Sequence, residues 1–401
     1  MVVPTPPRRS IPFVTTGTPL IYADFLLTGI VMTFLGPMLP ILSTRWSLTD
    51  GQSGFLIFAE FFSSIFGMLS SGVLVRRFGY RRTLMVGLAL MPAGMIMLGF
   101  GPWIVGVLST CVLGLGYGIT TPAGNLRTAE TNPKHSAAAL NLINAVWGIG
   151  AMASPFLLAI ALRAHKPRGF LLGTATALLL LLLLLALSRF DPDTRADSRN
   201  SGLATPWWSL PMLPLVCLLF FVYVGTEASL GNWVSMYARR VSPEDHSLST
   251  IVPSFFWGAL LAGRALAPVA LRSWRETSVA QAGLLVALVG GVALACAHRI
   301  ALVVVGAVFG GLGLAVIFPI SVSLLPTWFG DSAGRVSGAV FGSGNLGGAV
   351  LPWLVGAVST RFASLRMAFV VPLMSIAVLL VFYLAWGNAA RDWRWSQASQ
   401  P

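Results

Sequence analysis

Apolar stretches of about twenty residues each dominate this chain and leave few folds open to it. A helix needs about 20 consecutive apolar residues to cross the hydrocarbon core of a bilayer. Hydrophobic residues make up 56% of the 401 residues and charged residues only 10%, whereas soluble domains carry about 25% charged residues. We therefore predict an all-α integral membrane protein with twelve transmembrane helices, at 18–42, 53–75, 83–101, 103–126, 137–162, 169–188, 211–238, 250–271, 279–297, 300–326, 334–358 and 365–386.

The basic residues lie between these stretches and carry a formal net charge of +13. In a soluble protein this charge would suggest a nucleic-acid partner, but here the membrane lipid explains it better. Cytoplasmic loops of membrane proteins are enriched in Lys and Arg, and that bias is met when both termini are cytoplasmic. We expect a multi-pass protein of the plasma (inner) membrane, working as a monomer, with no nucleic-acid partner.

The two halves of the chain repeat one another across a polar segment at 189–210. "GLGYGITTPAGN" (114–125) resembles "GLGLAVIFPISV" (311–322) at a shift of 197 residues, and "WGIGAMASP" (147–155) matches "GNLGGAVLP" (344–352) at the same shift. Two matches at one offset predict two related six-helix bundles, at 1–188 and 211–401, joined by a cytoplasmic linker at 189–210.

Four arginines are concentrated in "GVLVRRFGYRR" (72–82), between the second and third apolar stretches. This segment resembles the loop G-x-L-x-D-R-x-G-R-R of the major facilitator superfamily. Its matching positions are Gly72, Leu74, Arg77, Gly79, Arg81 and Arg82, and Arg76 replaces the Asp of the family. The resemblance implies two six-helix halves that rock around a site at the bilayer midplane, with this loop and Arg264 as gating residues. Gly72 is expected to permit close helix packing and Gly79 to shape the turn.

Three shorter segments are similar to the fucose-permease (fucose:proton symporter) branch of that superfamily. They are "NLINAVWGIG" (141–150), Asn125 at the end of the fourth stretch, and "YVGTEASLGNW" (223–233). The two carboxylates of that branch align with Gly36 and Thr121, so neither can be carried over. Coupling to protons, if it occurs, must use other residues.

Ionisable residues inside an apolar stretch are expensive and are therefore functional candidates. Glu60 and Glu227 are candidates for proton coupling, or else hydrogen-bonded structural groups; for Glu227 the structural alternative is an ion pair with Arg239 or Arg240. For Arg264 we favour a structural role over binding an anion. Asp24 and Arg127 lie close to helix ends, where gate or surface residues are expected.

Amide and aromatic side chains suggest the class of solute, because amides both donate and accept hydrogen bonds and aromatic rings supply apolar walls. The predicted substrate-binding residues are Thr121, Asn125, Asn141, Asn144, Trp147, Glu227, Asn232, Trp257 and Asn345. They favour a secondary transporter or facilitator of a small polar solute, a sugar or a sugar-like compound. A multidrug or lipophile exporter of the same superfamily remains the alternative.

Motifs for catalysis and for metal or cofactor binding do not emerge from the sequence. The three cysteines lie within apolar stretches, and all four histidines fall in predicted loops or at helix ends. We therefore expect no enzyme, no cofactor and no metal site.

Overall fold

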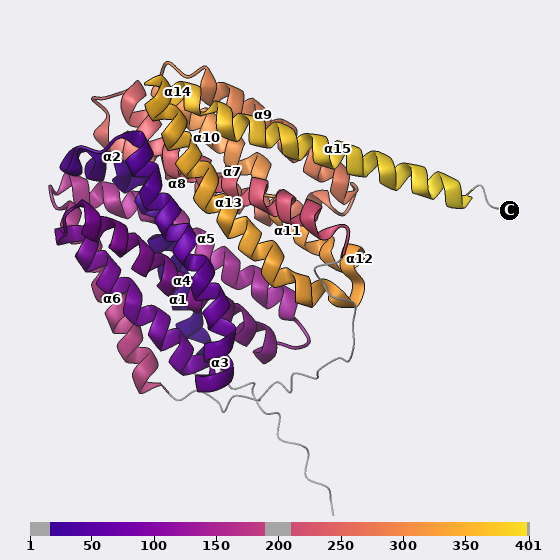
Figure 1. Cartoon of the computed structure of the whole chain (residues 1–401), viewed down its shortest axis with the longest axis horizontal. Coiled ribbons are helices and arrows are strands. Elements are labelled where there is room, and N and C mark those ends of the chain that lie inside the picture. Colours follow the sequence, from indigo (N-terminus) through magenta and orange to yellow (C-terminus); the bar gives the residue numbers. More distant parts are fainter. Residues whose placement is uncertain (1–16, 189–209, 399–401) are drawn as a thin grey trace, which may run out of the picture.

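The computed structural model describes residues 17–188 and 210–398, and in these ranges the regular structure is helical. Its helices are α1 (Gly17–Thr33), α2 (Leu35–Trp46), α3 (Asp50–Phe100), α4 (Trp103–Thr131), α5 (Ser136–Arg163), α6 (Pro167–Leu187), α7 (Leu213–Val241), α8 (His246–Ala270), α9 (Glu276–Ala295), α10 (Ile300–Leu314), α11 (Ile317–Ser323), α12 (Leu325–Phe329), α13 (Ala333–Phe362), α14 (Leu365–Ala368) and α15 (Val370–Ala398). Figure 1 shows them as one elongated bundle. The predicted linker, apart from residue 210, lies outside the described residues.

Twelve spans result once two irregular helices are taken into account. Within the described ranges, ten helical segments are long and apolar enough to cross a membrane, and α1 with α2, bent by 40°, makes an eleventh. The twelfth comes from α3, whose 51 residues include Gly79 with φ 80° and ψ 170°. Gly67 and Gly87, on either side of that residue, both lie against residues 115–120 of α4, so α3 folds back on itself and crosses twice.

Prolines explain why the predicted stretch 300–326 is broken into α10, α11 and α12. Pro319 lies in the first turn of α11 and Pro326 in the first turn of α12. Proline lacks a backbone N–H and clashes with the preceding turn, so it is accepted at a helix start and interrupts a helix interior. This span is therefore a chain of three short helices.

The internal repeat of the amino-acid sequence is matched by a repeat in the packing of the helices. A Cβ on Gly114 would lie 1.9 Å from the Glu60 carbonyl oxygen, and one on its repeat partner Gly311 would lie 2.2 Å from that of Phe256. Gly150 and its partner Gly347 likewise approach the carbonyls of Leu26 and Phe221, at 2.1 and 1.9 Å. Small residues let membrane helices approach to backbone contact. The matched glycines therefore do the same packing work in each half.

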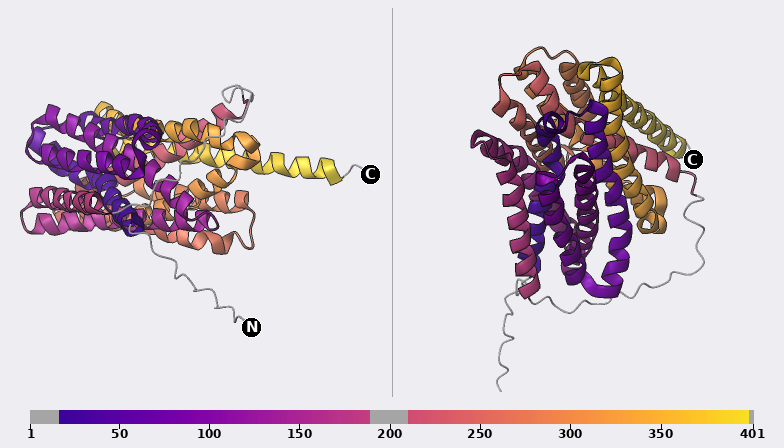
Figure 2. Two further views of the ribbon diagram at one scale, coloured as in Figure 1. Left: turned by 90° about the horizontal axis from the view of Figure 1, so that it is seen from below. Right: turned by 60° about the vertical axis from the view of Figure 1, so that its left-hand side comes forward.

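The N-terminal helices (α1–α6) and the C-terminal helices (α7–α15) lie on separate sides of the molecule in Figures 1 and 2. The two groups meet mainly through α3 against α13, α5 against α8, and α2 against α7. We call the end that holds the start of α3 the Asp50 end, and the opposite end, with the turn in α3, the Gly79 end.

Candidate functional site

The C-terminal helices place an ion pair in the middle of the membrane-spanning region. Arg264 Nη2 of α8 lies 3.6 Å from Glu227 Oε1 of α7, and the guanidinium lies 5.9 Å from the centre of the Phe318 ring. The Arg264 Nε is buried and has no hydrogen-bond partner. Glu227 thus pairs with Arg264 and not with Arg239 or Arg240. A helix-spaced sequence pattern could not identify this partner, because the two residues belong to different helices.

Glu60 of α3 is the second predicted acidic candidate, and it is more secluded than Glu227. It is 1% exposed, and neither carboxylate oxygen has a hydrogen-bond partner. A carboxyl group buried without a partner is costly, and in membrane proteins such groups mark functional positions. Its neighbour Ser64 on the same helix donates to Asn345 Oδ1 of α13 at 3.1 Å, which joins the two groups of helices at this level.

Tyr117 of α4 lies within electrostatic range of all these ionisable groups, and it was not among the residues predicted from the sequence. Its hydroxyl lies beside Thr121 and close enough to Glu60, Glu227 and Arg264 to interact with all three electrostatically. One tyrosine is therefore within electrostatic range of charged groups from both halves. The signal was present in the sequence, because Tyr117 falls within the repeated segment "GLGYGITTPAGN".

Two tryptophans from opposite groups of helices contact one another. The rings of Trp147 (α5) and Trp257 (α8) have centroids 5.8 Å apart and lie nearly perpendicular. Both indole nitrogens are buried without a hydrogen-bond partner. An indole N–H in an apolar site normally finds an acceptor, so this pair presents two unused donors beside aromatic surfaces. The prediction singled out both residues but did not pair them.

The predicted polar residues divide into two sets. Thr121 Oγ1 and Asn125 Oδ1 of α4 are buried without a hydrogen-bond partner, and Asn144 of α5 is exposed and donates to the Leu140 carbonyl. Asn141 is also exposed on α5. The helix α4 packs chiefly on α1, α3 and α5.

Asn232 and Asn345 form the second set and belong to helix packing. Asn232 is 4% exposed and donates to the Ala228 carbonyl, and its Cα would lie 2.7 Å from a Cβ on Gly36. Asn345 donates to the Phe341 carbonyl and accepts from Ser64. Both residues therefore lie where the N-terminal and C-terminal helices touch, Asn232 through its backbone and Asn345 through its amide.

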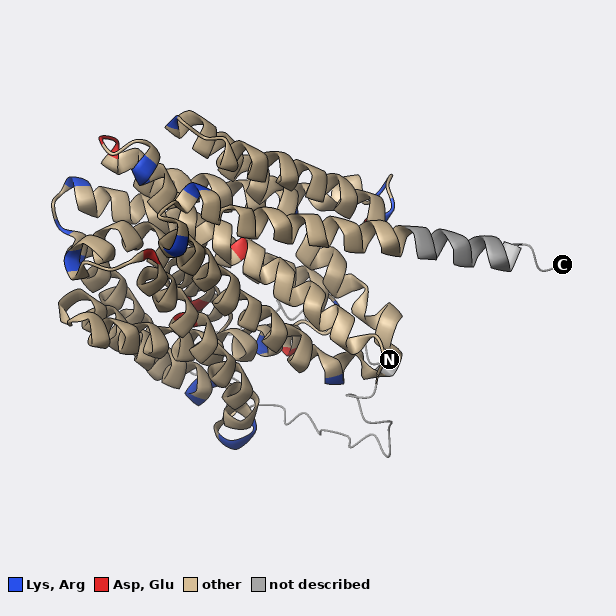
Figure 3. Cartoon of the chain, turned by 45° about the horizontal axis from the view of Figure 1, so that its top comes forward, with Lys and Arg blue, Asp and Glu red and all other residues tan. Residues whose placement is uncertain are grey.

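The arginine-rich turn follows Gly79 as predicted, but Gly72 does not behave as expected. A Cβ on Gly72 would meet only Arg76 Nη1, at 3.8 Å, so Gly72 is not needed for close packing. Arg76, Arg77 and Arg82 are exposed, whereas Arg81 donates to the Leu185 and Ala186 carbonyls at the end of α6. Figure 3 shows most Lys and Arg at helix ends and in loops.

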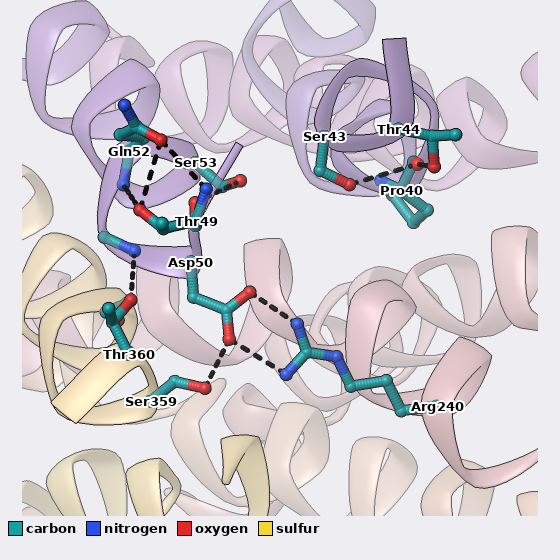
Figure 4. Close-up of polar contacts among 12 residues, drawn as sticks. Pro40, Ser43, Thr44, Thr49, Asp50, Gln52, Ser53, Arg240, Ser359 and Thr360 are labelled. Carbon is teal, nitrogen blue, oxygen red and sulfur yellow. Dashed lines mark hydrogen bonds and ion pairs between the residues drawn. The ribbon is translucent and has the colours of Figure 1, made fainter. Parts of the chain in front are cut away.

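A polar network missed by the sequence analysis closes the Asp50 end (Figure 4). Asp50 accepts hydrogen bonds from Arg240 Nη1 at 2.8 Å and Nη2 at 2.5 Å, and also from the Ser359 hydroxyl. The backbone N–H of Gly51 donates to Thr360 Oγ1 at 2.8 Å. The network ties α3 to α7 and α13. Its members lie near helix ends, where charged residues are common, so their spacing carried no signal.

Asp24 and Arg127 were expected as gate or surface residues, and their burial shows that the surface alternative is wrong. Asp24 is 2% exposed and neither carboxylate oxygen has a hydrogen-bond partner. Arg127 is 6% exposed, and its guanidinium lies 5.4 Å from the Tyr80 ring centre. Among the residues that the structure describes, no three His, Cys, Asp or Glu side chains gather as a metal ion would require.

Comparison with known proteins agrees with this architecture. Residues 25–272 match the Major Facilitator Superfamily. The chain is 23% identical to the glucose/mannose transporter GlcP of Bacillus subtilis (strain 168), over 84% of this chain and 86% of that protein. It is 24% identical to a glucose/galactose transporter of Brucella abortus biovar 1 (strain 9-941), over 90% and 91% of the two chains.

Solved structures share the fold at lower sequence identity. The nucleoside transporter NupG superposes with a TM-score of 0.74 at 12% identity, covering 92% of this chain and 98% of that one. The D-xylose-proton symporter gives 0.74 at 14% identity, with 92% and 96% covered. The E. coli fucose:proton symporter FucP gives 0.61 at 17% identity, with 91% and 97% covered. The match to the superfamily extends over more than half of the sequence, and the twelve spans and the repeated packing agree with it. This chain therefore belongs to the Major Facilitator Superfamily.

Proposed function

We propose that this protein carries a sugar or a sugar-like polyhydroxylated solute across the membrane by alternating access. The observation that carries the proposal is the contact of Trp147 with Trp257, which offers aromatic surface and two unused N–H donors between the halves. Sugar sites combine aromatic walls with a few placed polar groups, and Thr121 and Asn125 supply such groups on α4. The glucose transporters among its relatives support the same class of solute.

We propose that the Gly79 end faces the cytoplasm, because the exposed arginines of the α3 turn lie there. Both termini are then cytoplasmic in the inner membrane. The Asp50–Arg240 pair ties the two halves together at the Asp50 end, which supports a state closed on the side opposite the cytoplasm. The rocking units are the bundles 1–188 and 211–401, joined by the linker 189–210, and one copy of the chain is sufficient for transport.

Coupling to protons is assigned to Glu60 and Glu227. Glu60 has no partner that would hold it charged, so it takes up a proton when buried and releases it when water enters. Glu227 exchanges Arg264 for a proton, which requires a rearrangement of α7 against α8 within the C-terminal bundle. Tyr117 lies within electrostatic range of both carboxylates. Asn141 and Asn144, exposed on α5, contact the solute on its way to the Gly79 end.

Uptake into proteoliposomes tests the choice of solute. The panel contains glucose, galactose, mannose, xylose and fucose, with a nucleoside and an apolar dye as contrasts. Trp147→Phe and Trp257→Phe keep the ring and remove the N–H; loss of one hydrogen bond should raise KM about 2- to 10-fold. Trp274→Phe, in the turn between α8 and α9 and 60% exposed, is the matched control and should change nothing.

Failure of the sugar assignment would be visible in the same assay. If no sugar is taken up or exchanged while the dye is exported, the protein is a lipophile exporter. If all three tryptophan variants behave alike, the aromatic pair is not the site.

Coupling is tested separately with Glu60→Gln and Glu227→Gln. Each should abolish accumulation driven by a pH gradient while sparing counterflow exchange, because exchange needs no net proton movement. Glu244→Gln, in the exposed turn between α7 and α8, is the control. Accumulation by both variants at the normal level would refute the assignment.

A further inference from the structure

An apolar crevice lies on the surface of the helices, outside the proposed transport site. It has a volume of about 490 Å³ and opens between α3 and α6. Met85, Val86 and Ala89 line it from α3, and four residues between Leu179 and Ala186 line it from α6; every lining side chain is apolar. On the lipid-facing side of a membrane helix the surroundings are hydrocarbon, so an alkyl chain suits this crevice better than water.

Two arginines lie at the Gly79 end of this crevice. Arg81 donates from Nε to the Leu185 carbonyl at 3.1 Å and from Nη2 to the carbonyl of Ala186, which itself lines the crevice. These carbonyls belong to the last turn of α6, which has no further intrahelical donors. The Arg81 guanidinium is thus held at the mouth of the crevice by the helix end.

Arg82 supplies a second positive charge from α3. It is exposed and precedes Met85 by three residues and Val86 by four, so it lies one helical turn away on the same face. Side chains at this spacing have Cβ atoms about 5–6 Å apart. A long arginine side chain therefore reaches the polar boundary of the bilayer directly beyond the apolar lining.

We propose that this crevice binds an anionic phospholipid, with one acyl chain between α3 and α6 and the phosphate against Arg81 and Arg82. Guanidinium groups bind phosphate oxygens through paired, charge-assisted hydrogen bonds. Basic pockets between transmembrane helices are known to select acidic headgroups. A zwitterionic lipid offers the same chains but no net charge, so phosphatidylglycerol is bound in preference to phosphatidylethanolamine. The site lies outside the transport pathway and holds a lipid, not the transported solute.

Native mass spectrometry of the full-length chain in detergent tests this site. Phosphatidylglycerol and phosphatidylethanolamine with identical acyl chains are added in equal amounts, and the ratio of the two adducts is measured. The wild type should retain one phosphatidylglycerol preferentially. Arg82→Gln should lower that ratio about five-fold, as expected for one basic residue near a membrane surface, and Arg82→Lys should keep most of it.

Two further substitutions test the part of the site that holds the acyl chain. Val86→Trp and Leu183→Trp fill the crevice from α3 and from α6, and each should remove the retained adduct while the protein stays monodisperse. Val289→Trp is the control for bulk, because Val289 is an exposed residue of α9, 58% exposed. Arg299→Gln, an exposed arginine before α10, is the control for charge.

Three results would overturn the proposal. The first is equal retention of both lipids by the wild type. The second is a phosphatidylglycerol preference that survives both Val86→Trp and Leu183→Trp, which would mean surface attraction without a crevice. The third is a loss on Arg299→Gln as large as on Arg82→Gln, which would reduce the effect to net charge.

Discussion

Loss of the Asp50 carboxylate should release the closed end of this transporter. Asp50 is 11% exposed in its side chain and receives two hydrogen bonds from Arg240 and one from Ser359. Hydrogen bonds to charged groups contribute about 1.5–3 kcal/mol, but Arg240 is 42% exposed and exposed pairs contribute only about 0.2–1 kcal/mol. We therefore expect Asp50→Asn to weaken the closed state by about 1–2 kcal/mol, which changes the ratio of closed to open molecules about 5- to 30-fold.

Spin labels on the two groups of helices can measure this shift. Thr44 and Glu244 are exposed near the Asp50 end, on α2 and in the turn after α7, and each can be replaced by a labelled cysteine. The free cysteines Cys111, Cys217 and Cys296 must be removed first. Pulsed electron resonance then reports the distance between the labels, and Asp50→Asn should add a longer component that the wild type lacks.

A double-mutant cycle separates the ion pair from general charge effects. Asp50→Asn, Arg240→Gln and the double variant should not be additive, because either single change already breaks the pair. Arg239→Gln alters the neighbouring arginine, which does not contact Asp50, and should leave the distances unchanged. If Asp50→Asn leaves the distribution as in the wild type, or Arg239→Gln opens it equally, the pair does not hold this end closed.

Three further changes test the packing through thermal unfolding in detergent. Gly79→Ala should destabilise the protein by about 1–3 kcal/mol, because only glycine adopts φ 80° and ψ 170° easily. The control Gly72→Ala should be neutral or slightly stabilising. Equal effects of the two changes on the melting temperature would contradict a strained turn at Gly79. Gly114→Ala should lower the free energy of unfolding by about 3 kcal/mol or more, since its Cβ would lie 1.9 Å from the Glu60 carbonyl oxygen. The control Gly173→Ala, with no atom within 4 Å of the new Cβ, should not lower it. Tyr80→Phe removes the 2.6 Å hydrogen bond to Glu130 and should lower the free energy of unfolding by about 1 kcal/mol. An unchanged melting temperature would show that this bond does not contribute to stability.

The fold was largely predictable from the sequence, because each transmembrane helix is determined by the composition of its own segment. An apolar stretch of about twenty residues that matches the bilayer thickness becomes a helix, because only a helix satisfies all its backbone hydrogen bonds within one segment in lipid. The repeat was also readable, since Gly114 and Gly311 are each required where two backbones touch. The prediction of two separate spans at 53–75 and 83–101 is confirmed, because the non-helical backbone of Gly79 reverses the chain between the two halves of α3.

The candidate site was predicted in its residues but not in its partners. Glu60, Glu227, Trp147 and Trp257 stood out because polar or aromatic groups are costly or rare at these depths. Which of them meet depends on the rotation of each helix about its axis and on the tilt between halves. Tyr117 escaped notice because a tyrosine within an apolar stretch is also expected in ordinary packing.

The number of spans, the repeat and the concentration of arginine at one turn were all readable before the structure, because they follow from hydropathy and charge along one segment at a time. Tertiary structure alone decided that Arg264 pairs with Glu227, that Arg240 pairs with Asp50, and that Arg81 is fixed at the end of α6. Each of these contacts joins residues from different helices, and only the packed arrangement brings them within hydrogen-bonding or ion-pairing distance.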